Sequence, residues 1–276
     1  MTVQDISQVI LKEKYAKGSE ASLADVRRRV ADAAAGVEED PGFWAQRFFE
    51  CMERGFIPGG RINSAAGTGI GATLINCFVQ PVGDAMSGTD DTTGKPGITV
   101  ALQEAAETMR RGGGVGYDFS QIRPLGALVK GTDSMASGPL SYMRMFDAMC
   151  QTVESAGSRR GAQMGVLRVD HPDIEAFVAA KARPYAEKEL QQFNISVGVT
   201  DAFMRAVSGD SSFPLAHRAE PGEAIKAAGA YQRDDGLWVY RSIQARDLWE
   251  KIMRSTYDFA DPGVLFLDRI NAANNL

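Results

Sequence analysis

The sequence predicts an α/β fold in which a helical N-terminal region, residues 1–70, precedes a parallel sheet within residues 71–276. Two observations support this prediction. Apolar residues recur at helical spacing as far as about residue 70, whereas from residue 73 short apolar runs alternate with longer helical stretches. Because strands that are separated by helices pair in parallel, the second region is expected to form a sheet with crossover helices.

The N-terminal region is expected to contain several helices. Residues 23–34 carry apolar side chains at the spacing of one helix face. Asp40 and Pro41 then suit the cap and the first position of a further helix. Met52 lies on the apolar stripe of that helix with Cys51 beside it, so both are expected in the core.

Five apolar runs are predicted to be strands: residues 73–79, 114–119, 162–169, 193–199 and 264–267. Helices are expected near 98–111, 139–155, 172–182, 200–208 and 245–260. Pro172 suits a first helical position, and Thr200 can cap the next helix. Segments 212–217 and 237–243 alternate like a solvent-facing hairpin, which predicts an insertion near 210–243. Periodicity leaves open whether the five units form half of a closed barrel or an open doubly wound sheet.

Composition excludes several classes of protein. A net charge of -5 argues against sequence-independent binding of nucleic acid but permits a nucleotide ligand. No apolar run approaches about 18 residues and the start does not resemble a signal peptide, so no membrane span is expected. Three widely spaced cysteines form no disulfide framework, which indicates a reducing cytoplasm. Only His171 and His217 are present, so no metal site is expected.

Cys77 is the cysteine with the strongest functional signal, because it lies in the first predicted strand. A free thiol has a pKa of about 8.5, so it would be mostly protonated at neutral pH and able to form a disulfide. Parallel sheets also present functional groups at their strands. The alternative is a buried, inert strand cysteine. Cys150 shares a helix face with apolar residues and is expected in the core.

A glycine run and a polar loop could each contact a ligand. Within 112–116, Gly113 and Gly114 would let a ligand approach the backbone closely, or the run forms a helix C-cap and turn. Lys130 lies in a polar loop that leads into a helix, whose N-terminus would suit a triphosphate. The alternative for this loop is a surface turn.

A second loop, residues 157–165, places two adjacent arginines between glycines. Arg159 and Arg160 could contact bases or phosphates, because guanidinium groups stack and form bidentate hydrogen bonds. Adjacent arginines otherwise usually form a solvated surface.

Taken in order, these segments resemble the catalytic subunit of ribonucleotide reductases. Their amino-acid sequences look most like those of the adenosylcobalamin-dependent class. The matching motifs are Asn-Cys-Phe-Val at 76–79, Gly-Gly-Gly-Val-Gly-Tyr-Asp-Phe at 112–119, Arg-Arg-Gly-Ala-Gln-Met-Gly at 159–165, His-Pro-Asp-Ile-Glu-Ala-Phe at 171–177 and Asn-Ile-Ser-Val at 194–197. The resemblance covers about 40–276 well and implies a ten-stranded α/β barrel built from two five-stranded parallel halves. This chain would supply the first half only.

The resemblance also implies a reaction and roles for particular residues. A thiyl radical abstracts the ribose 3′-hydrogen, water leaves from C2′, and a cysteine pair supplies the reducing equivalents for deoxyribonucleotide synthesis. Cys77 resembles one member of that redox pair. Asn76, Gly113 and Gly114 resemble residues that contact the substrate.

A regulatory site is implied by the same family. Asp84, seven residues after Cys77, resembles the acid that binds the ribose of a deoxynucleoside triphosphate effector. Lys130 resembles a residue of the first effector loop. The second effector loop would include Ser158, Arg159, Arg160 and Gln163. The family would also form a homodimer through helices like those at 98–111 and 139–155.

The radical cysteine, the second redox cysteine and any adenosylcobalamin contacts have no counterpart in these residues. The expected partners are therefore the C-terminal half of the reductase and a thioredoxin-type reductant, besides the nucleotides. Two alternatives remain open. One is a non-catalytic deoxynucleotide-binding regulatory module, and the other is a small thiol oxidoreductase of unrelated function.

Overall fold

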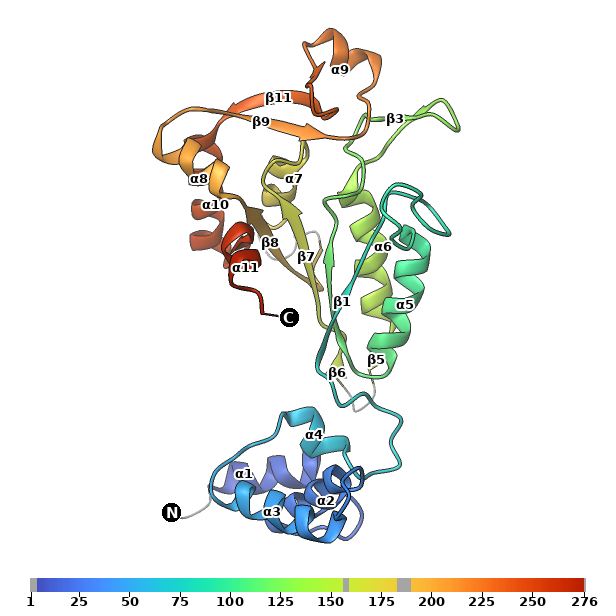
Figure 1. The fold of residues 1–276 in the computed structure, drawn as a ribbon, viewed down its shortest axis with the longest axis vertical. Helices are drawn as coiled ribbons and strands as arrows, with labels where there is room; N and C mark the ends of the chain where they lie inside the picture. Colours follow the sequence, from blue (N-terminus) through green and yellow to red (C-terminus); the bar gives the residue numbers. More distant parts are fainter. Residues whose placement is uncertain (1–3, 156–158, 183–189, 276) are drawn as a thin grey trace. The chain divides into compact units, whose positions relative to one another are not determined.

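The structure is a computed structural model that describes residues 4–155, 159–182 and 190–275. The chain forms two compact units (Figure 1). One unit comprises Met1–Phe78, Thr108–Gly114 and Glu154–Arg159, and the other comprises Val79–Glu107, Val115–Val153 and Arg160–Leu276.

The N-terminal part of the first unit is helical, as the sequence predicts. Its elements are α1 (Asp5–Ile10), the π-helical turn η1 (Leu11–Tyr15), α2 (Leu23–Ala35), α3 (Pro41–Glu53) and α4 (Gly60–Ala65). The Asp40 carboxylate caps α3 by accepting the Phe43 N–H, and Pro41 occupies the first turn. Met52 is buried, but Cys51 is exposed, so its predicted place in the core is wrong. Cys51 lies one residue from the buried stripe and therefore points away from it.

A five-stranded sheet has the order β1 (Cys77–Gln80), β2 (Gly114–Asp118), β7 (Gln163–Arg168), β8 (Phe193–Val199) and β12 (Gly263–Phe266). Strands β2, β7, β8 and β12 pair in parallel. The order follows the chain without reversal. A doubly wound sheet reverses its strand order at a switch point, whereas a barrel adds each strand beside the last. The topology therefore matches half of a barrel.

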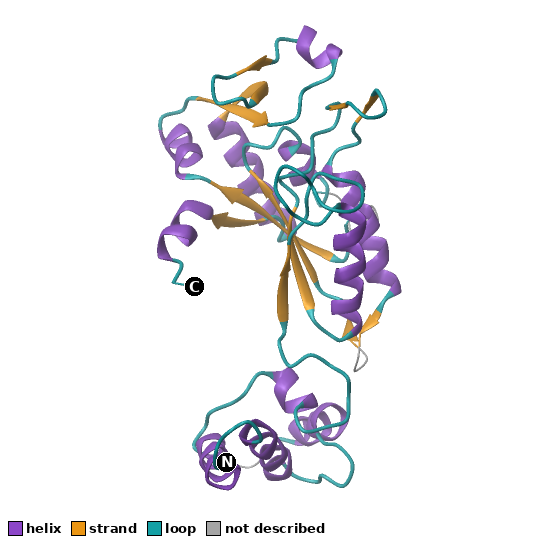
Figure 2. Ribbon diagram, turned by 45° about the vertical axis from the view of Figure 1, so that its right-hand side comes forward, coloured by secondary structure: helices purple, strands orange, loops and turns teal. Residues whose placement is uncertain are grey.

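Helices connect these strands close to the predicted positions: α5 (Ile98–Arg110), α6 (Pro139–Thr152), α7 (Ile174–Ala179), α8 (Asp201–Ser208) and α10 (Ala245–Phe259), with α11 (Leu267–Ala273) after β12. Helices α5 and α6 run side by side along the sheet (Figures 1 and 2). Phe146 of α6 makes edge contacts with Tyr117 and Phe119 at centroid distances of 4.8 and 5.4 Å. Phe193 of β8 completes this buried aromatic cluster.

Smaller sheets are present besides the five-stranded sheet. They are the pair β3 (Leu128–Val129) and β4 (Ser134–Met135), the pair β5 (Glu154–Ser155) and β6 (Arg159–Arg160), and the three-stranded sheet of β9 (Ser212–His217), β10 (Tyr231–Gln232) and β11 (Trp238–Gln244). Strands β9 and β11 pair antiparallel, as the alternation at 212–217 and 237–243 predicts. The link between them also holds α9 (Glu223–Ala227) and β10, which the sequence pattern did not indicate.

Two predicted boundaries are wrong. Strand β1 begins at Cys77 rather than residue 73, because the Thr73 hydroxyl accepts the Ile75 N–H at 3.1 Å and turns the chain there. Helix α7 begins at Ile174, so Pro172 lies before it. Asp173 is the residue before α7, and its carboxylate makes a tertiary contact by accepting the Leu125 N–H at 2.9 Å.

Candidate functional site

The predicted substrate-contacting residues come together at the start of β1 and β2, within the first unit. The Gly114 N–H donates to the Asn76 carbonyl at 2.7 Å. Cys77 follows directly as the first residue of β1, and its side chain is exposed. The position differs from that of open α/β sheets, whose ligands bind at the carboxyl ends of the strands. The exposed thiol is nevertheless accessible to a ligand.

Gly113 has a packing reason to be glycine. A Cβ there would lie 2.8 Å from the Phe78 ring and 2.8 Å from Cγ2 of Thr108, both closer than real contacts allow. Gly112 adopts a φ of 88°, which favours glycine, and its carbonyl accepts the Arg61 guanidinium. These two glycines therefore serve the turn between α5 and β2, and a substrate contact at Gly113 stays a prediction.

The three cysteines are reduced and differ sharply in exposure. Cys51 and Cys77 are exposed, whereas Cys150 is 2% exposed on the inner face of α6. Burial raises the pKa of the Cys150 thiol to about 11, and the nearby Asp147 carboxylate adds to the effect. Cys150 is therefore an inert core residue, as the sequence predicts.

A cavity of about 870 Å³ lies within the second unit and brings together two predicted effector residues, Asp84 and Lys130. Its lining comes from the loop after β1, the loop after β2, the turn between β3 and β4, and the β9–β11 sheet. The residues are Asp84, Asp90, Thr92, Arg123, Leu128, Val129, Lys130, Gly131, Arg218, Ala219, Glu220, Gln232 and Trp238. We refer to it below as the Asp84–Lys130 cavity.

Asp84 is nearly buried in this cavity and is held by Arg123. Its Oδ1 accepts the Arg123 backbone N–H at 3.0 Å, and its Oδ2 accepts the Arg123 Nε–H at 2.9 Å. Burial raises the pKa of Asp84 above its ordinary value, and the attraction of Arg123 offsets only part of that rise. Arg123 in turn donates to the Leu128 carbonyl at 3.1 Å, which ties Asp84 to β3.

A second buried carboxylate fixes the loop after β1. Oδ2 of Asp90 accepts from the Arg218 guanidinium at 2.8 Å, from the Thr93 hydroxyl at 2.6 Å and from the Asp84 N–H at 3.2 Å. Although burial opposes ionisation, these hydrogen bonds hold the pKa of Asp90 well below its ordinary range. Arg218 belongs to the segment after β9, so this ion pair joins the inserted sheet to the loop that carries Asp84.

Lys130 is the cation of the cavity that can most readily change partner. Its side chain is 76% exposed, and its ammonium lies 3.3 Å from Glu220. Glu220 also binds Lys226 at 2.7 Å, so it keeps a counterion if Lys130 turns to a ligand. Exposed ion pairs of this kind contribute little to stability.

Of the remaining predicted effector residues the structure describes the side chain of Gln163, which does not line this cavity. Gln163 is 3% exposed, and its amide bonds the Phe146 carbonyl at 3.2 Å and the Tyr117 hydroxyl at 3.4 Å. Both ends of the amide are used inside the core, and an effector contact at Gln163 stays a prediction. Ser158 lies outside the described residues, as do the side chains of Arg159 and Arg160.

The two histidines are buried against one another, with ring centroids 5.4 Å apart. Nδ1 of His171 accepts the Asp173 N–H at 3.1 Å, and its Nε2 bonds the Ile122 carbonyl at 3.0 Å. Nδ1 of His217 likewise accepts the Ala219 N–H at 2.9 Å. A ring nitrogen that accepts a hydrogen bond carries no proton, so these bonds keep both rings neutral. The described residues contain no cluster of three metal-binding side chains.

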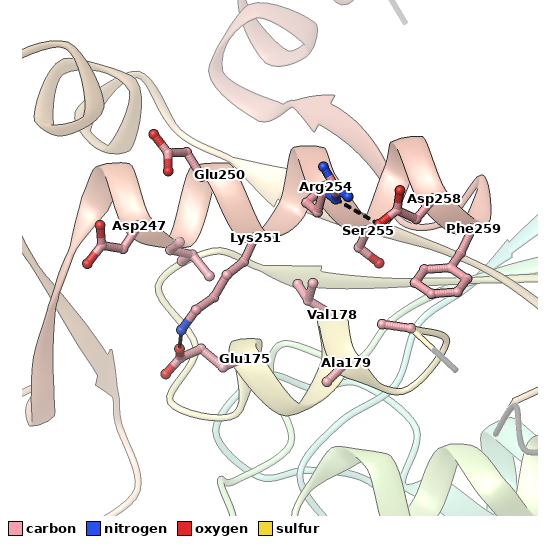
Figure 3. Close-up of a pocket in the computed structure, with 12 residues that line it drawn as sticks. Glu175, Val178, Ala179, Asp247, Glu250, Lys251, Arg254, Ser255, Asp258 and Phe259 are labelled. Carbon is pink, nitrogen blue, oxygen red and sulfur yellow. Dashed lines mark hydrogen bonds and ion pairs between the residues drawn. The ribbon is translucent and has the colours of Figure 1, made fainter. Parts of the chain in front are cut away.

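A second hollow of about 700 Å³ lies between α7 and α10 and contains none of the predicted site residues. Figure 3 shows Lys251 reaching Glu175, at 2.5 Å, and Arg254 bound to Asp258, at 2.8 Å. Its charged groups thus largely pair across or along the helices. No helix in the described part of the chain has the length and apolarity to cross a membrane.

The exposure of the thiols predicts their reactivity. In the native chain Cys51 and Cys77 should react rapidly with a chromogenic disulfide reagent, and Cys150 should react only after unfolding. The measurement is the number of thiols titrated before and after denaturant, with Cys77→Ser losing one fast equivalent. An unchanged number of fast thiols in Cys77→Ser would contradict the exposed position of Cys77.

The histidine pair predicts a pH dependence of stability. Burial, followed by the neighbouring His171 and Arg218, lowers the pKa of His217 to about 3 from 6.5. Because the unfolded chain then binds the proton more tightly, the free energy of unfolding should fall as pH drops from 6.5 towards 3. At pH 5 the titration of His217 should lower the free energy of unfolding by about 2 kcal/mol relative to neutral pH.

Urea unfolding at pH 7.5 and pH 5 measures this loss, and His217→Gln should remove it while other titrating groups remain. An equal loss of stability in the wild-type chain and the variant would show that His217 titrates normally in the folded state.

Comparison with known proteins is consistent with this geometry. The model of the ribonucleotide reductase all-alpha domain matches residues 1–71, and that of the ribonucleotide reductase barrel domain matches residues 75–276. The chain is 37% identical over 276 residues to a vitamin B12-dependent ribonucleoside-diphosphate reductase of Mycobacterium tuberculosis (strain CDC 1551 / Oshkosh), covering 96% of this chain and 36% of that protein.

A second relative with the same description comes from Thermoplasma acidophilum and is 36% identical over 234 residues, covering 84% of this chain and 27% of that protein. The chain thus spans about a third of the length of the curated relatives it matches. Among solved structures, the Actinobacillus ureae class Id ribonucleotide reductase alpha subunit shares the fold with a TM-score of 0.66 at 21% identity. That match covers 98% of this chain and 41% of the subunit.

The order of the five strands, the helical N-terminal region and the two family matches agree with one another. The chain belongs to the ribonucleotide reductase large-subunit family, of which it contains the N-terminal all-alpha domain and the first part of the barrel domain.

Proposed function

We propose that this chain is the N-terminal part of an adenosylcobalamin-dependent ribonucleotide reductase that converts ribonucleotides to deoxyribonucleotides. The observation that carries the proposal is the exposed thiol of Cys77, which follows Asn76, the residue whose carbonyl accepts the Gly114 N–H. The relatives of the chain are named as vitamin B12-dependent reductases. Adenosylcobalamin would supply the radical initiator when bound to the complete enzyme. No residue of this chain is assigned to its binding.

In this proposal Cys77 supplies one of the two thiols that are oxidised. The ribonucleotide loses its 2′-hydroxyl as water and gains hydrogen at C2′, while two thiols become one disulfide and release two electrons and two protons. Asn76 and the Gly114 backbone orient the ribose beside Cys77. Exposure of the thiol supports this role, because a thioredoxin-type reductant must reach the disulfide to reduce it again.

The Asp84–Lys130 cavity is proposed to bind a deoxynucleoside triphosphate effector. Its volume of about 870 Å³ falls in the range of small-molecule sites. Lys130 would turn from Glu220 to the phosphates, and Asp84 would accept hydrogen bonds from the deoxyribose. The second effector loop, with Ser158, Arg159 and Arg160, would lie between effector and substrate.

The complete enzyme is proposed to add the second half of the barrel, with the radical cysteine and the other redox cysteine. Strongly exposed apolar side chains on both edge strands support this, since Val79 of β1 is 88% exposed and Phe266 of β12 is 46% exposed. We place the domain boundary near residue 70, where the two family matches meet. A homodimer through α5 and α6 and a cytoplasmic location complete the proposal.

A regulatory module without chemistry is the second candidate. The observation that favours it is that the residues of the Asp84–Lys130 cavity all belong to the second unit, whereas Cys77 belongs to the first. Such a module would bind deoxynucleotides with the same residues and would not depend on its thiols.

Reconstitution separates these candidates. When the C-terminal half, adenosylcobalamin and a dithiol are supplied, the chain should support ribonucleotide reduction, and Cys77→Ser should lower turnover by at least about 10³-fold because the disulfide cannot form. Cys51→Ser, which removes the other exposed thiol, should leave turnover unchanged. Full activity in Cys77→Ser would eliminate the catalytic role and favour the regulatory module.

The effector site predicts a salt-dependent nucleotide affinity. Lys130→Gln should weaken binding of dATP about 10-fold and reduce its salt dependence, because one phosphate contact is lost. Asp84→Asn should also weaken binding, since the deoxyribose loses a charged acceptor while Arg123 keeps a hydrogen-bond partner. Isothermal titration calorimetry measures the dATP affinity of both variants.

The matched control for these titrations is Lys14→Gln, an exposed lysine of η1 that lies outside the cavity. Equal affinities for the wild-type chain, Lys130→Gln and Asp84→Asn would show that the nucleotide does not bind in this cavity.

A further inference from the structure

We propose that the hollow between α7 and α10 is a docking groove for an amphipathic helix of a partner protein, and that this helix carries basic residues beside its apolar face. The groove contains none of the residues proposed above to contact substrate or effector. Three features support the assignment: the shape of the lining, its apolar floor, and carboxylates at one end that lack a counterion.

The lining of the groove consists of one face of each of two helices (Figure 3). On the α7 side, Glu175, Val178 and Ala179 follow one another at the spacing of a helix face. On the α10 side the lining extends from Asp247 to Phe259, which is about 18 Å at 1.5 Å per residue. A helix of about 12 residues laid along the groove would fill this length.

The groove is held open by contacts on either side of it. On the far side of α10, the Trp249 ring contacts Phe203 of α8 at a centroid distance of 6.4 Å. Across the groove, Glu175 of α7 binds Lys251 of α10 at 2.5 Å and Arg241 of β11 at 2.6 Å. Because both helices are fixed in this way, a partner does not have to order them, and this preorganisation favours binding.

The floor of the groove is apolar and presents small side chains. Val178 and Leu248 are buried at its base, with 5% and 1% of their surfaces exposed, and Ala179 is exposed beside them. Ser255 also lines the base, but its hydroxyl already donates to the Asp261 carbonyl at 2.8 Å. The floor therefore makes no polar demand on a ligand and suits aliphatic side chains that project from a helix.

The charges of the lining are unbalanced at one end. Asp258 is paired with Arg254 at 2.8 Å, and Glu175 is paired as described. Asp247 and Glu250 form no ion pair with the described residues. Asp247 stands in the first turn of α10, where an acid also stabilises the helix dipole, whereas Glu250 stands beyond that turn. The end of the groove near the start of α10 is thus negative and favours a lysine or an arginine.

This combination points to a basic helix rather than to a small molecule or an acidic partner. Small-molecule sites gather polar groups that converge on the ligand, whereas here the inner charged groups bind one another. An acidic helix would place like charges against Asp247 and Glu250, which costs affinity. A helix with leucines on one face and lysines at its flank satisfies both the floor and the rim.

The experiment measures binding of three fluorescein-labelled peptides to the full chain by fluorescence anisotropy. The first has about 14 residues, with leucines at helical spacing and lysines at the remaining positions. The second replaces every lysine by glutamate, and the third has the composition of the first in an order without helical periodicity. The leucine–lysine peptide should bind at least about 10-fold more tightly than either of the others.

Two variants locate the binding in the groove. Glu250→Lys should weaken the leucine–lysine peptide about 5-fold and strengthen the leucine–glutamate peptide, because the charge at the rim is reversed. Ala179→Gln should weaken the leucine–lysine peptide about 10-fold, since a longer polar side chain then occupies the apolar floor. The matched control is Glu39→Lys, which makes the same change of charge at an exposed residue outside the groove and should leave both affinities unchanged.

Circular dichroism melting of each variant shows that it is folded, since Glu250 and Ala179 are both exposed and glutamine and lysine favour helices. Equal binding of the three peptides, or an unchanged affinity in both Glu250→Lys and Ala179→Gln, would overturn the assignment. Sedimentation tests the other occupant: a dimer of the unliganded chain that Ala179→Gln dissociates would place a second copy of this chain in the groove instead of a basic helix.

Discussion

The packing of α6 onto the sheet is the constraint on which the second unit depends. Phe146 meets Tyr117 and Phe119 of β2 and its flanking residue, and these rings are at most 2% exposed. Each such buried side chain stabilises the fold by roughly 1.5–3 kcal/mol. Because β2 leads to Arg123 and α6 follows the Lys130 turn, the same cluster anchors both chain segments that line the Asp84–Lys130 cavity.

Electrostatic pairing then determines what the cavity can do. The chain carries a net charge of -5, yet its cavity holds three carboxylates and three cations that satisfy one another. Two of these pairs are buried or nearly so and fix loops, because breaking one would leave an uncompensated charge. The third pair is exposed and exchangeable. The structure thus separates residues that hold the cavity in shape from the single lysine available to an anion.

The sequence predicted elements whose signals are local and missed those set by distant partners. The run Phe193–Val199 is apolar and β-branched, and it forms β8 with the predicted bounds. Residues 73–76 are also apolar, but Thr73 turns the chain and Ile75 is 62% exposed. For the site, proximity in sequence was enough to place Asn76 beside Cys77. The partnership of Asp84 with Arg123, 39 residues later, left no trace in spacing or pattern, and neither did the burial of Gln163.

The Asp84–Lys130 cavity is proposed above to hold a nucleotide between the barrel loops and the inserted sheet. Photo-crosslinking with 8-azido-dATP, followed by mass spectrometric mapping, tests it most directly. Peptides from residues 123–131 and 218–238 should be labelled, and excess dATP should suppress the labelling. Labelling confined to the α7–α10 hollow, or spread over the surface and insensitive to dATP, would contradict it.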